Sequence, residues 1–147
     1  MSGPATAQHL DEVRELFLEK IPFNRVLGIQ ILRLDPGNVL FSVPFRPELV
    51  GDPVRGALHG GVISAVADTC GGCAVWSALS GEDRVSTIDL RVDYLRPGRA
   101  EELRCRGEVQ RLGNRVGVAQ ISLFHPSTPD EVVAEAKGVY SVRRAEA

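Results

Sequence analysis

Asp68 is the residue of this sequence whose surroundings most favour chemistry, because it is the single charged residue in an apolar stretch, residues 60–79. If that stretch is a helix, residues three, four and seven apart share a face. The face of Asp68 then holds almost only small residues: Gly61, Ser64, Ala65, Gly71, Gly72 and Val75. Buried carboxylates are uncommon unless they are paired, and an acid in a narrow groove of small residues is a candidate for a functional site. The alternative is a silent, hydrogen-bonded structural carboxylate, and we favour the functional interpretation.

His59, Gly60 and Gly61 stand where this helix is predicted to begin. The first N–H groups of a helix have no partner within the helix, and they lie at the positive end of its dipole. Glycine at such a position lets a ligand oxygen come close to the backbone. These donors can polarise a carbonyl and stabilise a developing oxyanion, an effect of about 3–4 kcal/mol per donor in other enzymes. The simpler alternative is that the glycines only shape the turn and that His59 caps the helix.

The spacing of these two groups predicts a dimer. His59 and Asp68 are nine residues apart, which is about 13 Å along a helix, and they lie on opposite faces of it. They therefore cannot act together within one chain. Two such helices that run antiparallel across a two-fold axis would bring the start of one to the middle of the other, and would form two equivalent composite sites.

Upstream of this helix the pattern predicts a shorter helix and two strands. Residues 9–21 carry apolar residues at helical spacing, and Pro22 is expected to stop that helix. Residues 29–34 and 38–45 are predicted to be strands joined by a tight turn that contains proline and glycine. A polar loop, residues 46–58, then leads to the long helix.

Downstream of residue 81, apolar and polar residues alternate, as in strands with one wet and one dry face. In the first of these strands, Ile88 is expected on the dry face and Thr87 on the wet face. A single helix as apolar as residues 60–79 has to be covered, and only a sheet is long enough to cover it. We therefore expect an α+β fold in which a mostly antiparallel six-stranded sheet wraps around one long central helix, with a short N-terminal helix. The four downstream strands are predicted at residues 87–94, 103–110, 116–124 and 132–142.

Length and composition predict a globular protein with a single domain, residues 1–147, in which residues 1–8 are a flexible N-terminus. The net charge is −2 and no run of five like charges occurs, which argues against binding to nucleic acid. Residues 60–79 carry a carboxylate and four glycines, so they are not expected to span a membrane. The first residues lack a signal-peptide pattern, and three cysteines do not suggest a disulfide scaffold. We therefore expect a cytoplasmic protein.

Other reactive residue types are expected to be structural. Cys70 and Cys73 match the C-x-x-C spacing of redox and metal sites, but they lie in mid-helix, and all three cysteines are expected in the core. His9 and His125 are expected at the surface. The histidines have no metal-ligand spacing, so no metal site is predicted. Ser77 has no base at a recognisable offset and is expected to have no catalytic role.

Three segments of the sequence, HGGVISAVADTCGG, STIDLRVDYLRPG and RLGNRVGVAQISLF, resemble the hotdog-fold thioesterase superfamily. The similarity covers about residues 28–142 and is greatest to the phenylacetate-pathway (PaaI-type) branch of acyl-CoA thioesterases. Its most specific part is His-Gly-Gly with an acid nine residues after the histidine. The resemblance implies the hotdog fold and hydrolysis of an acyl- or aryl-CoA thioester to a carboxylic acid and CoA. It also implies that no cofactor is needed and that the protein is a homodimer, paired into a homotetramer.

The resemblance implies roles for individual residues as well. Asp68 matches the family's general base or nucleophile, and the Gly60 amide matches the donor that polarises the thioester carbonyl. His59 matches a residue that positions the site, and Thr87 matches a strand residue that assists it. Two further contacts with the substrate are expected on the same helix, Gly61 and Ser64.

Pro53 stands where the family has Asn or Gln, six residues before the histidine, and the neighbouring Asp52 is a weak candidate to replace it. Two other functions remain open. A hotdog-fold enoyl-CoA hydratase or dehydratase would need His59 itself to exchange protons. A non-catalytic acyl-CoA-binding protein is the third, and the missing amide at Pro53 keeps it open. Five arginines on strands or near strand ends either are solvated or contact CoA phosphates: Arg91, Arg96, Arg99, Arg111 and Arg115.

Overall fold

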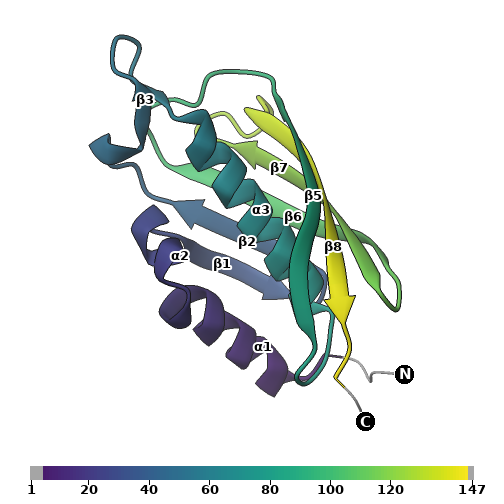
Figure 1. The fold of residues 1–147 in the computed structure, drawn as a ribbon. Coiled ribbons are helices and arrows are strands. Elements are labelled where there is room, and N and C mark those ends of the chain that lie inside the picture. The colour runs from purple at the N-terminus through teal and green to yellow at the C-terminus, as the bar shows by residue number, and fades with distance from the viewer. Residues whose placement is uncertain (1–4, 146–147) are drawn as a thin grey trace.

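The computed structural model describes residues 5–145, which form a six-stranded sheet with a long helix across it. All neighbouring strands in this sheet are antiparallel. The helix, α3 (Gly60–Ser77), lies along the inner face of the sheet, which curves around it (Figure 1). The predicted α+β architecture, a six-stranded sheet wrapped around one central helix, is confirmed. The strands lie in the order β1 (Gln30–Asp35), β2 (Asn38–Val43), β6 (Leu103–Leu112), β7 (Val116–Phe124), β8 (Ala134–Arg143) and β5 (Arg84–Tyr94).

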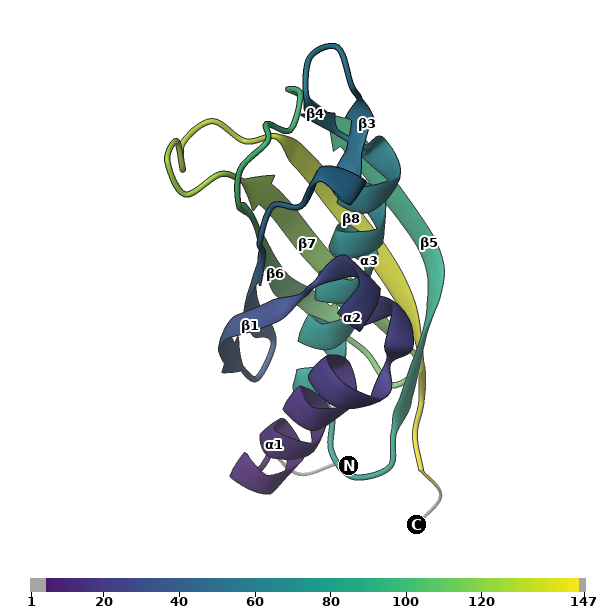
Figure 2. The same cartoon turned by 90° about the vertical axis from the view of Figure 1, so that its left-hand side faces the viewer.

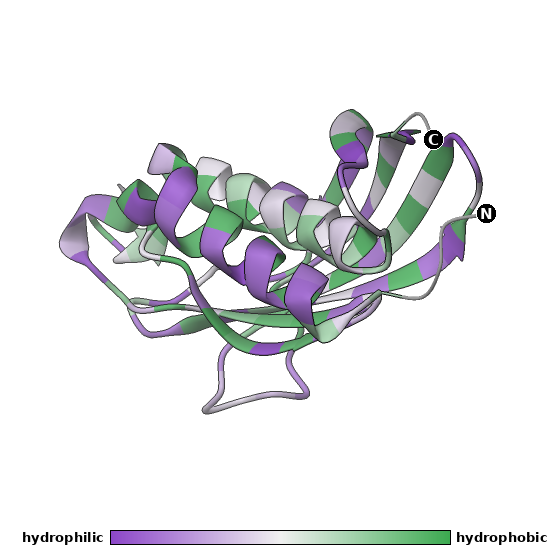
Figure 3. Ribbon diagram, turned by 90° about the horizontal axis from the view of Figure 1, so that it is seen from below, coloured by the Kyte–Doolittle hydropathy of each residue, from purple (hydrophilic) through white to green (hydrophobic). Residues whose placement is uncertain are grey.

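The helix and the sheet share one hydrophobic core, as the alternation of residue types predicts. Figure 3 shows hydrophilic and hydrophobic residues alternating along the strands. Cys70 and Cys73 on the helix are fully buried, as are Phe41 and Ile121 on the sheet. A Cβ on Gly107 in β6 would lie 3.0 Å from the Cys70 carbonyl oxygen, so glycine here lets the helix lie close to the sheet. All three cysteines are free and buried, which confirms that they pack in the core.

The N-terminal region is more helical than predicted. The helix α1 (Ala7–Glu15) is capped by the Thr6 hydroxyl and continues through a π-helical turn (Leu16–Lys20). The first helical segment ends before Pro22, as predicted, since Ile21 is extended, but Pro22 then begins a second helix, α2 (Pro22–Leu27). The reason is that the first position of a helix needs no N–H donor, and proline already has the φ angle required there.

The predicted flexible N-terminus, residues 1–8, is described only in part, because residues 1–4 lie outside the described residues. Ala7 and Gln8 form the first turn of α1. Figure 2 shows α1 and α2 on the same side of the sheet as α3. The ring of Phe17 meets Trp76 of α3 edge-on, with the ring centroids 6.0 Å apart, and this contact attaches the N-terminal helices to the core.

The predicted loop at residues 46–58 contains a short hairpin that leads into α3. Its strands are β3 (Val50–Asp52) and β4 (Ala57–Leu58), which pair with each other and not with the large sheet. The Leu58 N–H donates to the Gly98 carbonyl oxygen at 2.8 Å, which ties the hairpin to the loop after β5. The start of α3 is therefore supported by two separate segments of the chain.

The edge strand β5 contains a bulge that changes which residues face the helix. Thr87 pairs with Tyr140 and Asp89 pairs with Val139, so Ile88 is an extra residue in β5. An insertion of one residue shifts a strand by half of its two-residue period. The alternation of helix-facing residues before Ile88 is therefore out of phase with the alternation after it.

The prediction for this strand is wrong at its start because of the bulge. Ile88, predicted on the dry face, is 58% exposed. Thr87, predicted on the wet face, points to α3 and makes a hydrogen bond there. Beyond the bulge, Leu90 and Val92 pack against the core, as predicted.

The prediction that His9 and His125 lie at the surface is also wrong, because both side chains are buried. The Nε2 atom of His9 donates to the carbonyl oxygen of Trp76 at 2.9 Å. Two backbone groups make hydrogen bonds to the His125 ring. Each ring thus satisfies a buried backbone group, a role that residue spacing alone does not show.

Candidate active site

Asp68 lies in the middle of α3, half-buried, with its carboxylate turned toward β5. The Thr87 hydroxyl donates to Asp68 Oδ1 at 2.8 Å, and this contact exists because the bulge turns Thr87 toward the helix. The Tyr140 hydroxyl donates to the Asp68 backbone carbonyl at 2.9 Å. Burial, and then the nearby Asp68 carboxylate, raise the pKa of Tyr140, so its hydroxyl remains a donor. Thr87 therefore orients the carboxylate from the sheet, and Tyr140 fixes the helix backbone that carries it.

His59 caps the start of α3. Its Nδ1 accepts the Gly61 N–H at 2.8 Å, so the neutral ring carries its proton on Nε2. A Cβ on Gly61 would lie 2.8 Å from this Nδ1, which explains the glycine. The sequence left helix capping by His59 as an alternative. This cap is present, and it uses the N–H of Gly61. Among residues 5–145, no acceptor faces the N–H of Gly60, which leaves this amide for a ligand.

Ser64 and Tyr94 meet at the carbonyl oxygen of Gly60. The Ser64 hydroxyl donates to this oxygen at 2.9 Å, and the Tyr94 hydroxyl lies 3.1 Å from it and 2.5 Å from Ser64 Oγ. Sequence analysis gave Tyr94 no role and missed this contact. The available signal was a hydroxyl at the end of an otherwise aliphatic face. The first turn of α3 is therefore attached to β5 by side chains.

A hollow of about 270 Å³ opens beside Gly60. Its walls come from β4, the first turn of α3, the end of β5 and the loop that follows β5, and most of them are apolar. A larger hollow of about 1390 Å³ lies at the other end of α3, beside Trp76, and none of the predicted site residues line it. We place the site at the smaller hollow because it adjoins the free Gly60 amide. Its lining is Leu58, Gly60, Ile63, Tyr94, Leu95, Arg96, Pro97 and Gly98.

Gly60 and Asp68 lie at separate points of one helix. They are eight residues apart, which is about 12 Å along the axis. One thioester carbonyl cannot reach both groups in a single chain. The structure thus gives both groups suitable surroundings without bringing them together in one chain.

Asp52 is the last residue of β3, and Pro53 begins the turn of the β3–β4 hairpin. Asp52 Oδ1 accepts the N–H groups of Val54 and Arg55 at 3.0 and 3.2 Å. This carboxylate shapes the turn in the way typical of aspartate. It is therefore poorly suited to replace the amide side chain that the family has at the position of Pro53.

The remaining candidate residues fall into two groups. Arg91, Arg96 and Arg99 are engaged within the chain, by an ion pair, a backbone carbonyl and a set of carboxylates and hydroxyls. Arg111 and Arg115 have no side-chain partner among residues 5–145. The described part of the chain contains no cluster of three His, Cys, Asp or Glu side chains placed to hold a metal ion. Within the same residues, no helix is long and apolar enough to cross a membrane.

Comparison with known proteins identifies the family of this chain. Residues 55–132, which include Gly60, Asp68 and Thr87, match the model of the thioesterase superfamily. The chain is 36% identical to the medium/long-chain acyl-CoA thioesterase YigI of Escherichia coli (strain K12), over 97% of this chain and 99% of that protein.

Two solved structures have a similar fold. A protein of Shewanella oneidensis related to the thioesterase superfamily matches with a TM-score of 0.81 and 35% identity, over 93% of this chain and 97% of that one. A thioesterase family protein of Silicibacter pomeroyi matches with a TM-score of 0.85 and 27% identity, over 93% and 99%. The chain therefore belongs to the thioesterase superfamily.

Proposed function

We propose that this protein is an acyl-CoA thioesterase that hydrolyses the thioester to a carboxylic acid and CoA, without a cofactor. The observation that carries the proposal is the hydrogen bond from Thr87 to Asp68, which orients a carboxylate in the middle of an apolar helix. The name of the Escherichia coli relative supports CoA thioesters as substrates, with a medium or long acyl chain. A cytoplasmic location is part of the same proposal.

The reaction uses two groups on opposite subunits. The Gly60 N–H of one subunit donates to the thioester carbonyl oxygen, and Asp68 of the other faces the carbonyl carbon. Asp68 either removes a proton from the attacking water or attacks the carbon itself and forms an anhydride that water then opens. In both routes the C–S bond breaks, CoA leaves as the thiolate and takes up a proton, and the acyl group leaves as the acid. His59 keeps the Gly60 amide in place by capping the helix.

The edge strand β5 supports the dimer that this mechanism requires. It stands at one end of the strand order, so one side of its backbone is open to pairing with a second copy. Three large apolar residues on or next to it are about half exposed: Ile88 at 58%, Tyr94 at 53% and Leu95 at 53%. An isologous contact through β5 buries these side chains and sets the two α3 helices antiparallel. Pairing of two such dimers gives a homotetramer.

A thiol-release assay over aliphatic and aryl acyl-CoAs tests the function. Asp68→Asn keeps the size of the side chain but removes its charge, and turnover should fall about 10²–10⁴-fold. Thiol release at the wild-type rate by a folded Asp68→Asn protein would contradict the proposal. Conversion of an enoyl-CoA without thiol release would select the hydratase, and binding without any reaction would select an acyl-CoA-binding protein.

A matched pair of substitutions tests the Gly60 amide. Gly60→Pro removes the N–H at the helix position that best accepts proline, and the extended backbone of His59 is compatible with a following proline. Gly60→Ala keeps the N–H, and its Cβ would lie 3.5 Å from the Tyr94 ring, an ordinary contact. We expect turnover to fall about 10²–10³-fold in Gly60→Pro and much less in Gly60→Ala. Equal activity of the two variants would remove this amide from the mechanism.

A further inference from the structure

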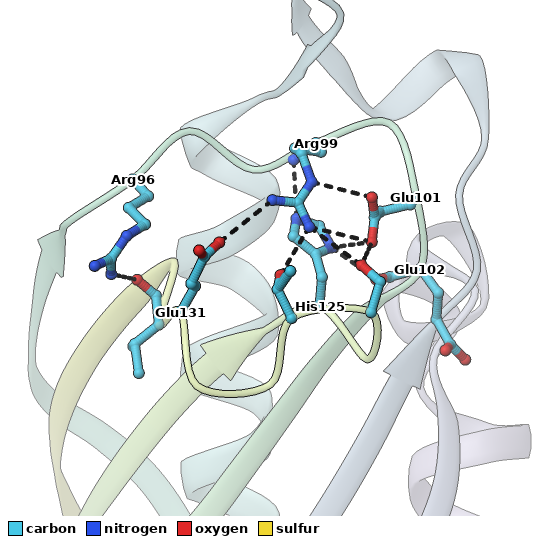
Figure 4. Close-up of polar contacts among 9 residues, drawn as sticks. Arg96, Arg99, Glu101, Glu102, His125 and Glu131 are labelled. Atoms are coloured by element: carbon cyan, nitrogen blue, oxygen red, sulfur yellow. Dashed lines mark hydrogen bonds and ion pairs between the residues drawn. The ribbon is translucent and has the colours of Figure 1, made fainter.

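His125 is buried at one end of the sheet, among loops that reach the start of α3. Its side chain is 1% exposed. It directly follows β7 and faces the loop from β5 to β6, residues 95–102 (Figure 4). The mechanism above gives no role to this ring, although both of its nitrogen atoms make hydrogen bonds to backbone groups.

The two backbone partners define the protonation state of His125. The Arg99 N–H donates to Nε2 at 2.9 Å, so Nε2 carries no proton. Nδ1 lies 2.8 Å from the Glu102 carbonyl oxygen, which can only accept, so Nδ1 carries the proton. Only the neutral ring makes both hydrogen bonds. A second proton, on Nε2, would face the Arg99 N–H and break that bond.

Charged groups surround the ring on the two loops that pack against it. The Glu101 carboxylate lies 3.9 Å from Nδ1, and the Arg99 guanidinium contacts both Glu101 and Glu131. Hydrogen bonds from Arg99 and Ser127 lower the pKa of Glu101 to about 2, so this carboxylate stays charged in mild acid. Of the other charged side chains on these loops, Glu102 pairs with Arg104, Arg96 donates to the Val132 carbonyl, and Asp130 has no side-chain partner among residues 5–145.

The peptide group that His125 holds also supports the residues before Gly60. The Gly98 carbonyl belongs to the same peptide group as the Arg99 N–H, and it accepts the Leu58 N–H at 2.8 Å. The Leu58 side chain packs on Gly98, where a Cβ would lie 3.0 Å from Leu58 Cδ1. Leu58 and Gly60 are two residues apart. One planar unit thus joins His125 to the start of α3.

We propose that His125 is a positioning residue for the thioester-binding end of α3, acting through the Gly98–Arg99 peptide group, and that its protonation releases this end in acid. The inference rests on the proposed function, which assigns the Gly60 amide to the thioester carbonyl. Because the peptide group is planar, turning its N–H away from His125 also turns its carbonyl away from Leu58. A displacement of about 1 Å at a reacting group can lower turnover by about 100-fold.

Two substitutions separate the hydrogen bonds of His125 from its charge. In His125→Gln, the side-chain oxygen can accept the Arg99 N–H and the NH₂ group can donate to the Glu102 carbonyl, but the amide takes up no proton near neutral pH. His125→Leu removes both hydrogen bonds. His9→Gln is the control, because His9 is also buried but lies beside Trp76, at the other end of α3.

Amide NMR follows the geometry without substrate as the pH is lowered from about 8 to about 5. In the wild type, and in His9→Gln, we expect the Arg99, Leu58 and Gly60 amides to shift together as pH falls, and kcat to fall with them. The Gly61 amide reports His59 separately, because its N–H bonds to that ring. In His125→Gln the three amides should stay at their neutral-pH positions, and the variant should keep most of its kcat in acid. In His125→Leu, kcat should be about 10–100-fold lower at neutral pH, with a smaller change in KM.

The proposal fails if His125→Gln loses kcat in acid as the wild type does, or if kcat follows the Gly61 amide and not the Arg99 amide. It also fails if a folded His125→Leu protein keeps wild-type kcat. A wild-type protein that releases no thiol would contradict the proposed function. The NMR shifts would still show whether His125 is coupled to Gly60.

Discussion

Gly71 and Gly72 lie side by side in α3, yet the structure predicts opposite effects when each is replaced by alanine. A Cβ on Gly71 would overlap the Tyr140 hydroxyl and lie 2.7 Å from Ile121 Cδ1. A Cβ on Gly72 would lie 3.4 Å from the nearest Tyr140 ring carbon, which is an ordinary contact. Tyr140 cannot move aside freely, because its hydroxyl donates to the Asp68 carbonyl.

The two substitutions share one favourable term, so their difference isolates the cost of the overlap. Replacing a mid-helix glycine by alanine stabilises a helix by about 1 kcal/mol at either position. Overpacking at Gly71 costs about 1–3 kcal/mol, and losing the Tyr140 hydrogen bond costs about 1 kcal/mol more. We therefore expect the free energy of unfolding of Gly71→Ala to be about 2–4 kcal/mol below that of Gly72→Ala.

Urea unfolding followed by circular dichroism measures this difference. Both variants have to be compared at the same protomer concentration, since the stability of a dimer depends on it. Adding Tyr140→Phe to Gly71→Ala should recover part of the loss, and a double-mutant cycle gives the coupling. Equal stability of the two alanine variants would refute the close packing of Gly71 against Tyr140.

Three further outcomes follow from individual contacts. Thr87→Val removes the hydroxyl that orients Asp68, so kcat/KM should fall about 10-fold and recover in Thr87→Ser. An unchanged kcat/KM in Thr87→Val would show that Asp68 does not need this hydroxyl. Burial raises the pKa of Cys70 and of Cys73, so both thiols should react with a disulfide reagent only after unfolding in urea, and fast labelling of the folded protein would contradict their burial. Hydrogen bonds from Arg99 and Ser127 lower the pKa of Glu101 from 4.5 to about 2. Its contribution to the free energy of unfolding is therefore complete above about pH 4.5 and is lost as the pH falls toward 2. Glu101→Gln should be less stable than the wild type at pH 7 and should approach the stability of the wild type in acid. A difference in the free energy of unfolding that stays constant in acid would contradict this.

Regular periodicity explains which parts of the fold the sequence predicts. α3 and β7 have long, uninterrupted patterns, and their positions agree with prediction to within about two residues. The bulge at Ile88 does not appear in such a pattern, because a single inserted residue leaves both halves of the strand alternating. The sequence pattern therefore put Thr87 on the wrong face, although the family resemblance placed it in the site.

Residues whose role depends on the folded backbone were the ones missed. The rings of His9 and His125 satisfy carbonyl and N–H groups that are distant in the chain, and only the folded structure brings these groups together. Pro22 gave the correct local signal, a helix boundary, but the sequence did not show that a second helix starts there. Tyr94 was missed, because its hydroxyl finds a partner only when β5 lies beside the start of α3.

The composite site is tested most directly by mixing two inactive variants, Asp68→Asn and Gly60→Pro. Random pairing makes about half of the dimers mixed, and each mixed dimer has one site with both lesions and one with neither. Mixed dimers should therefore restore thiol release to about a quarter of the wild-type rate. If mixed dimers form, as shown by differently tagged subunits, and no activity returns, Gly60 and Asp68 do not act across the interface.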